Sequence, residues 1–96
     1  MIVFFTPEAE ADIAEATRWL RKQSNELPPR FESAVAKAIA DAVAFPEAYP
    51  VVHRSIRQVL TRTFPYGVYY LIERERLVVV GVVHDARHPS TWQGRI

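Results

Sequence analysis

The fold is decided by residues 57–84, which read RQVLTRTFPYGVYYLIERERLVVVGVVH. Apolar and polar residues alternate there with a period of two, the period of a β-strand. The pattern predicts three strands, over residues 57–64, 67–73 and 76–84. Their connections, Pro65-Tyr66 and Arg74-Glu75, are short, so we expect antiparallel hairpins. The third strand is apolar on both faces, which predicts an interior position in the sheet.

Upstream of these strands the sequence has a helical period. Residues 2–5 predict a short strand, and Thr6-Pro7 begins a helix, because threonine caps helix N-termini and proline suits the first turn. This helix ends in the polar residues 21–25. A second helix is predicted over residues 29–45, where apolar side chains recur at helical spacing, followed by an irregular passage set by two prolines. The chain is therefore predicted to be an α+β domain of order β-α-α-β-β-β, with a helical hairpin on one face of a mostly antiparallel four-stranded sheet.

Length and composition narrow the class of protein. The chain has 96 residues, of which 49% are hydrophobic, which predicts one globular domain over residues 1–96. Cysteine is absent, so disulfides and thiolate chemistry are excluded. The start lacks a basic leader, and no apolar stretch approaches the roughly 20 residues that cross a bilayer. We therefore expect a cytoplasmic protein that does not associate with membranes.

Charge is distributed unevenly along the chain. Residues 1–50 contain five Lys/Arg and eight Asp/Glu, whereas residues 51–96 contain seven Arg, no Lys and three Asp/Glu. Arginine binds phosphates and carboxylates through a planar fork, unlike the point charge of lysine. The second half thus predicts either a basic binding surface or arginines that only solubilise the sheet.

Two segments carry a resemblance to a known family. They are RTFPYGVYYLI at residues 62–72 and VVVGVVHDARHP at residues 78–89. Together with the Thr6-Pro7 helix start and the Phe45-Pro46 helix end, this ordered set resembles the RelE/ParE superfamily of type II toxin–antitoxin toxins, with the ParE-like branch favoured. The resemblance implies a toxin that stops growth and a cognate antitoxin that wraps it. ParE-like members inhibit DNA gyrase, whereas RelE-like members cut messenger RNA in the ribosome without a metal.

The residues at the nuclease positions distinguish the two branches. Many RelE-like nucleases carry an arginine after the first tyrosine of a Y-R-hydrophobic-hydrophobic-Y pattern, and here that position is Gly67. If the chain were nonetheless a nuclease, residues near the end of the last strand would have to supply the acid–base groups. Together with one arginine from an earlier strand, they would also have to neutralise the phosphate. These candidate catalytic residues are His84, Arg87, His88 and Arg62. A zinc site or a serine triad built from neighbouring residues is not expected.

The favoured interpretation is a toxin that acts by binding a macromolecular target and is not an enzyme. It implies no cofactor, no metal and no small-molecule substrate. Candidate residues for target or antitoxin binding are Arg54, Arg57, Arg62, Tyr69, Arg87, His88 and Trp92. Tyr69 and Tyr70 point to opposite faces of a strand, so we expect one in the core and one exposed. The alternatives are a ribosome-dependent endoribonuclease and a degenerate domain that only represses transcription with its antitoxin.

Overall fold

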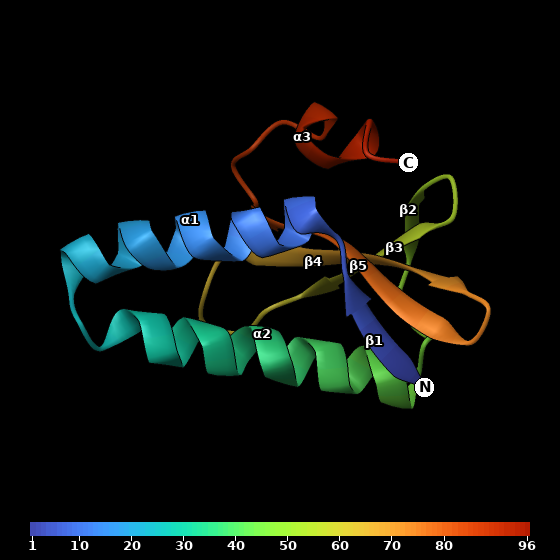
Figure 1. Cartoon of the computed structure of the whole chain (residues 1–96), viewed down its shortest axis with the longest axis horizontal. Helices are drawn as coiled ribbons and strands as arrows, with labels where there is room; N and C mark the ends of the chain where they lie inside the picture. The colour runs from blue at the N-terminus through green and yellow to red at the C-terminus, as the bar shows by residue number, and fades with distance from the viewer.

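The elements follow one another in the order strand, two helices, four strands and a short helix in a computed structural model that describes all 96 residues (Figure 1). They are β1 (Ile2–Phe5), α1 (Pro7–Gln23), α2 (Leu27–Ala44), β2 (Val51–His53), β3 (Ile56–Leu60), β4 (Tyr66–Glu73), β5 (Arg76–His84) and α3 (Ser90–Gln93). The strands form one sheet in the order β1-β5-β4-β3-β2. β1 runs parallel to β5, and all other neighbours are antiparallel. The α+β class and the helical hairpin are thereby confirmed.

The sheet has five strands, so the prediction of four was wrong. The additional strand is β2, which lies in the passage predicted to be irregular. It pairs with β3 through Val51↔Arg57 and His53↔Ile56, with a shift of register between the two pairs. Three residues with an interrupted register are too short to display a period of two, which is why the sequence pattern did not reveal this strand.

The connection between β3 and β4 is also longer than predicted. β3 ends at Leu60, and Tyr66 is already the first residue of β4. Thr61 closes this loop: its main-chain N–H donates to the carbonyl oxygen of Tyr66 (3.0 Å), and its hydroxyl donates to the carbonyl oxygens of Phe64 (2.7 Å) and Tyr66 (3.1 Å). Thr63 then adopts a positive φ of 65°, which no strand residue can have. The second hairpin turn, Arg74-Glu75, lies where it was predicted, with φ angles of 51° and 62°.

Local sequence signals explain the helix boundaries. The Thr6 hydroxyl accepts a hydrogen bond from the Ala9 N–H (3.1 Å), as expected of an N-cap. α2 begins two residues earlier than predicted, at Leu27. Pro28 and Pro29 lie in its first turn, where peptide N–H groups have no helical acceptor and prolines are tolerated. In Figure 1 the two helices run antiparallel beside each other.

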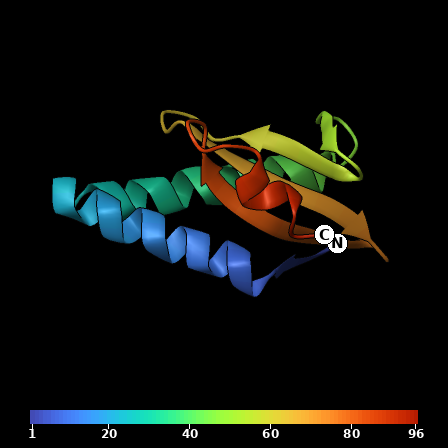
Figure 2. The same cartoon turned by 90° about the horizontal axis from the view of Figure 1, so that it is seen from above.

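Two apolar cores lie on opposite faces of the sheet. The larger one, between the helical hairpin and the sheet, is a cluster of 15 buried residues that includes Phe31, Val68 and Tyr70. The smaller one, on the outer face, contains six: Ile56, Tyr69, Val78, Val80, Val83 and Trp92. Figure 2 shows α3 lying across the strands on this side. β5 contributes to both cores and is an interior strand, as predicted.

The outer core corrects the prediction for the two adjacent tyrosines. Tyr69 is 6% exposed and Tyr70 is fully buried, so neither is a surface residue. They do point to opposite faces, but α3 returns over the outer face and covers Tyr69. The strand period shows that the side chains alternate; it cannot show that the C-terminal segment covers the second face.

Candidate functional site

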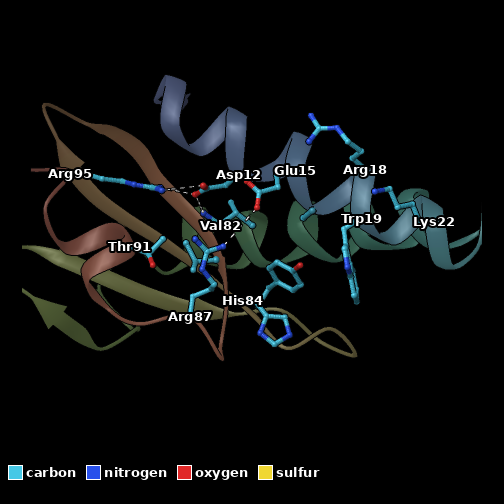
Figure 3. A pocket seen from close by; sticks show the side chains of 13 residues that line it. Asp12, Glu15, Arg18, Trp19, Lys22, Val82, His84, Arg87, Thr91 and Arg95 are labelled. Carbon is cyan, nitrogen blue, oxygen red and sulfur yellow. Dashed lines mark hydrogen bonds and ion pairs between the residues drawn. The ribbon is translucent and has the colours of Figure 1, made fainter.

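A groove lies between α1 and the end of β5 (Figure 3). Its volume is about 360 Å³, and its walls come from α1, from the end of β5 and from the C-terminal segment. Two carboxylates and four cations line it: Asp12, Glu15, Arg18, Lys22, Arg87 and Arg95. We call it the α1–β5 groove. Because both signs of charge are present with cations in excess, the groove suits a partner that carries acidic groups.

The floor of the α1–β5 groove is the edge of β5 beyond the end of β1. β1 pairs with β5 only as far as Val79. Past that point, side chains take the place of the missing strand: an Arg95 Nη1–H donates to the carbonyl oxygen of Val80 (3.0 Å), and Asp12 Oδ2 accepts from the N–H of Val82 (3.0 Å). These bonds satisfy two main-chain groups that an edge strand would otherwise leave open.

The same two side chains form the shortest ion pair of the molecule. Arg95 Nη1 lies 2.6 Å from Asp12 Oδ2, and Nη2 lies 3.1 Å from Oδ1, a two-pronged contact. Both side chains are largely buried, at 17% and 16% exposure. Gly81 makes this possible, because a Cβ there would lie 3.0 Å from Arg95 Nη1. The pair therefore joins α1, β5 and the C-terminal segment into one unit.

One wall of the groove is formed by Tyr66 and its neighbours. The Tyr66 ring packs edge-on against His84 (centroids 5.1 Å apart) and against Phe31 (4.8 Å). Burial raises the pKa of Tyr66, the carboxylate of Glu15 raises it further, and Arg87 opposes the shift. Arg87 lies 3.9 Å from Glu15, with both side chains more than half exposed, so this ion pair contributes little. The phenol therefore stays protonated at neutral pH.

The predicted cluster at the end of β5 is only partly brought together. His84 and Arg87 line the α1–β5 groove, but His88 does not. The His84 Nδ1 accepts from the N–H of Ala86 (2.9 Å), which places the proton of the neutral ring on Nε2. His88 is exposed in the segment before α3, where its Nδ1 lies 3.0 Å from the Ser90 hydroxyl and accepts from the Ser90 N–H (3.1 Å).

The three predicted arginines upstream lie elsewhere and apart. Arg57 donates from Nη1 to the carbonyl oxygens of Glu47 (3.1 Å) and Tyr49 (2.7 Å), so it holds the chain that leads into β2. Arg54 lies in the exposed turn between β2 and β3, with φ of 53°. Arg62 is exposed in the β3–β4 loop and lines a second groove. None of the three lines the α1–β5 groove.

The aromatic candidates Tyr69 and Trp92 are packed against each other. Their rings stack with centroids 4.1 Å apart and an interplanar angle of 20°. The Tyr69 hydroxyl also accepts from Gln58 Nε2 (2.9 Å). A Cβ built on Gly67 would lie 3.0 Å from that hydroxyl oxygen and 3.1 Å from two ring carbons. The Tyr69 ring thus occupies the space into which a side chain at position 67 would extend.

Sequence reasoning did not single out several groove residues. Asp12 and Arg95 are 83 positions apart, and no periodicity links them. Trp19, which also lines the groove, is 56% exposed although tryptophan is usually well covered. The sequence did indicate that Trp19 lies beside the apolar stripe of α1. A residue at that position points its side chain to the margin of the contact between helix and sheet. No group of three His, Asp or Glu side chains could hold a metal ion, and no helix is long and apolar enough to cross a membrane.

The fold of this chain is similar to that of a solved structure. A chain from the chromosomal ParDE TA system of P. aeruginosa superposes with a TM-score of 0.73, over 88% of this chain and 95% of that one. The sequence identity is 14%, so the likeness shows a shared fold, that of a small α+β domain found in a toxin–antitoxin system. A sequence comparison with curated proteins gives no match.

The family follows from the sequence itself. Residues 3–89 match the family model described as "ParE toxin of type II toxin-antitoxin system, parDE". The chain therefore belongs to the ParE toxin family, and the resemblance inferred from the two sequence segments is confirmed.

Proposed function

We propose that this ParE-family chain stops growth by binding DNA gyrase, without cutting RNA, and that a cognate antitoxin neutralises it by filling the α1–β5 groove. Family membership supports the role of a toxin. The observation that carries the choice of target is the surroundings of Gly67, at the position where RelE-like nucleases carry an arginine.

An arginine at position 67 would not fit the present packing. The ring of Tyr69 lies over Gly67, stacks on Trp92 and is hydrogen-bonded to Gln58. Placing a long cationic side chain there would displace the ring and open the outer core. This aromatic packing therefore occupies the place where a nuclease would carry a phosphate-neutralising cation. The absence of that cation supports a toxin that acts by binding over a nuclease.

The alternative is a ribosome-dependent endoribonuclease. Its support is that His84 and Arg87 line one groove with Tyr66, so an acid–base group and a cation lie on the same wall. Its weakness is that His88 and Arg62, the remaining candidates, lie outside that groove. A phosphate bound at one place could not contact all four residues in this arrangement.

The antitoxin part of the proposal rests on the open edge of β5. The N–H of Val82 points into the α1–β5 groove, where it meets Asp12. In an extended strand, the N–H and C=O of one residue face the same edge, and the residue two positions later faces that edge as well. The Val82 C=O and the His84 N–H therefore also face the groove. An extended acidic segment could pair with these groups while its carboxylates meet Arg18 and Lys22 and an apolar side chain packs on Trp19.

The predicted binding residues divide according to their present contacts. Arg87 and His88 are exposed beside each other at the end of β5, and Arg54 and Arg62 are exposed in turns. These four are proposed as direct contacts with gyrase or the antitoxin. Arg57, Tyr69 and Trp92 are engaged inside the molecule. We propose that these three support the binding surface rather than contact a partner.

Purified proteins provide the test of the target. The chain is added to a gyrase supercoiling assay and, in parallel, to ribosomes translating a labelled messenger. The proposal expects lost supercoiling with intact messenger, and weaker inhibition by Arg87→Ala/His88→Ala. Arg21→Ala, on the exposed end of α1, is the matched control and should inhibit like the parent. Messenger cut at the ribosome with normal supercoiling would instead establish the nuclease.

The antitoxin groove has a separate test. Trp19→Ala should weaken binding of the cognate antitoxin by about 30-fold or more, the loss typical of an aromatic residue at the centre of an interface. Phe45→Ala removes a similarly exposed aromatic ring, 67% exposed, from outside the groove and serves as the control. Equal affinities of the two variants for the antitoxin would exclude the α1–β5 groove as its binding site.

A further inference from the structure

A second groove lies where the β3–β4 loop meets the first turns of α2. It is lined by Pro29, Arg30, Ser33, Ala34, Arg62 and Thr63. No carboxylate is among these residues, and neither arginine takes part in an ion pair. The two guanidinium groups are both exposed, and they lie on elements about thirty positions apart in the chain. We call this the Arg30–Arg62 groove.

The loop that carries Arg62 is firmly held. From the β3 side of the loop, the Thr61 hydroxyl donates to the carbonyl oxygens of Phe64 and Tyr66 on its β4 side. The Phe64 ring packs edge-on against Phe31 of α2, with centroids 5.4 Å apart. Arg62 is therefore presented by a loop that is fixed to the same helix that carries Arg30. Preorganisation of this kind reduces the conformational entropy lost when a ligand binds.

The loop beside the groove also contains a residue with a strained backbone. Thr63 has φ of 65°, a left-handed conformation that a β-branched residue rarely adopts because its Cβ substituents crowd the backbone. Such conformations persist only where the surroundings impose them, so the contacts of Thr61 and Phe64 fix the shape of the loop. Glycine would adopt this conformation without strain. Here a threonine occupies the position next to Arg62.

The lining indicates which ligand the groove takes. A peptide needs an apolar anchor, and Ala34 is the one small apolar side chain available besides Pro29. A phosphate group needs cationic forks and hydroxyl donors, and Arg30, Arg62 and Ser33 supply them. We propose that the Arg30–Arg62 groove binds the phosphodiester backbone of a nucleic acid. This binding goes beyond the proposed action on gyrase and does not depend on it.

The experiment measures binding of the full chain to a short labelled DNA duplex by fluorescence anisotropy over a range of salt concentrations. Arg30→Ala/Arg62→Ala should weaken binding at least tenfold and flatten the slope of log K against log salt by about 0.9 for each lost phosphate contact. Arg21→Ala/Arg74→Ala removes the same charge from two exposed arginines that line neither groove and is the control. Circular dichroism establishes that each variant is folded. Equal losses in the two double variants would overturn the proposal.

Two further arms test the source of the phosphate and the role of the loop. Inorganic phosphate titrated alone should bind far more weakly than the duplex; affinity equal to that of the duplex would show a single-anion site and overturn the assignment to a nucleic acid. Thr63→Gly should leave the unfolding temperature unchanged or raise it, yet weaken duplex binding a few-fold because the loop loses its fixed shape. Unchanged duplex binding by this variant would remove the strained loop from the proposal.

Discussion

The two faces of the sheet are covered in different ways. The inner face packs against α1 and α2, and its core of 15 buried residues includes Phe31, Val35 and Ile39 of α2, with Val43 partly buried against it. The outer face has a core of six, closed by the four residues of α3. A helix of one turn has little stability of its own, so its position depends on tertiary contacts.

Those contacts are few and specific. Trp92 stacks on Tyr69, Arg95 pairs with Asp12, and Gly81 leaves room for the guanidinium. On the inner face many contacts share one core, so a substitution there weakens the whole domain, whereas the outer core depends on a handful of residues whose loss stays local. Substitutions on the two faces should therefore differ in the extent of the molecule that they affect.

The largest effect is expected on the inner face. Phe31 is fully buried and packs edge-on against Phe64 and Tyr66. Phe31→Ala should lower the free energy of unfolding by about 3–5 kcal/mol, through lost burial and the cavity left behind. Urea unfolding followed by circular dichroism measures it. Phe45→Ala, at a ring that is 67% exposed, should change stability by less than about 0.5 kcal/mol.

A smaller and more local effect is expected on the outer face. Trp92→Ala should cost about 2–3 kcal/mol, below the usual loss for a buried tryptophan because the C-terminal segment can detach instead of leaving a closed cavity. Hydrogen exchange should then accelerate at residues 90–95 and stay slow in α2. Trp19→Ala, at the exposed tryptophan, is the control. Faster exchange throughout the molecule would show that the two faces are not independent.

The contact between Gly81 and Arg95 allows a sharper test of the outer face. Arg95→Ala should cost about 1.5–2 kcal/mol, since charged hydrogen bonds to Asp12 and Val80 are lost. Gly81→Ala should cost about 1 kcal/mol, because the new methyl group would crowd the guanidinium at 3.0 Å. With Arg95 already removed, the same methyl group meets less resistance, so the double variant should lose less than the sum. Additive losses would contradict this account.

The features that the sequence predicted are those that local patterns encode. The Thr6 cap, the apolar spacing of α2 and the apolar run of β5 each act over a few residues, and the structure confirms them. β2 and the burial of Tyr69 were not predicted, because both depend on segments that come together only in the folded chain. A three-residue strand leaves no period to detect. The sequence indicated a turn or one short helical turn over residues 89–92, but four residues leave no period that would show which face of the sheet they cover.

The candidate site follows the same rule. His84 and Arg87 were predicted because they lie at and just after the end of a predicted strand, and both line the α1–β5 groove. Asp12 and Arg95 were not predicted, because nothing in either local sequence indicates a partner 83 positions away. Gly67 was predicted only in part. The sequence showed that an arginine is missing at this position, and only the structure showed the tyrosine ring that fills the space.

The smallest expected effect concerns pH and again belongs to the inner face. Burial raises the pKa of Tyr70, with Tyr49 adding to the shift and Arg57 opposing it, and its hydroxyl donates to the carbonyl oxygen of Pro46 (2.8 Å). Burial likewise raises the pKa of Tyr66. In the unfolded chain both phenols titrate near the ordinary value of about 10.

A group whose pKa is higher in the folded state stabilises the fold fully below its unfolded pKa. That stability is lost as pH rises from about 10 through the folded value, by at most about 1.4 kcal/mol per pH unit for each proton. Tyr70→Phe should cost about 1 kcal/mol at neutral pH through the lost hydrogen bond, and its stability should fall less steeply than that of the parent above pH 10. Urea unfolding at a series of alkaline pH values compares the slopes. If the slopes of Tyr70→Phe, Tyr66→Phe and the parent coincide, titration of the inner-face tyrosines does not control alkaline unfolding.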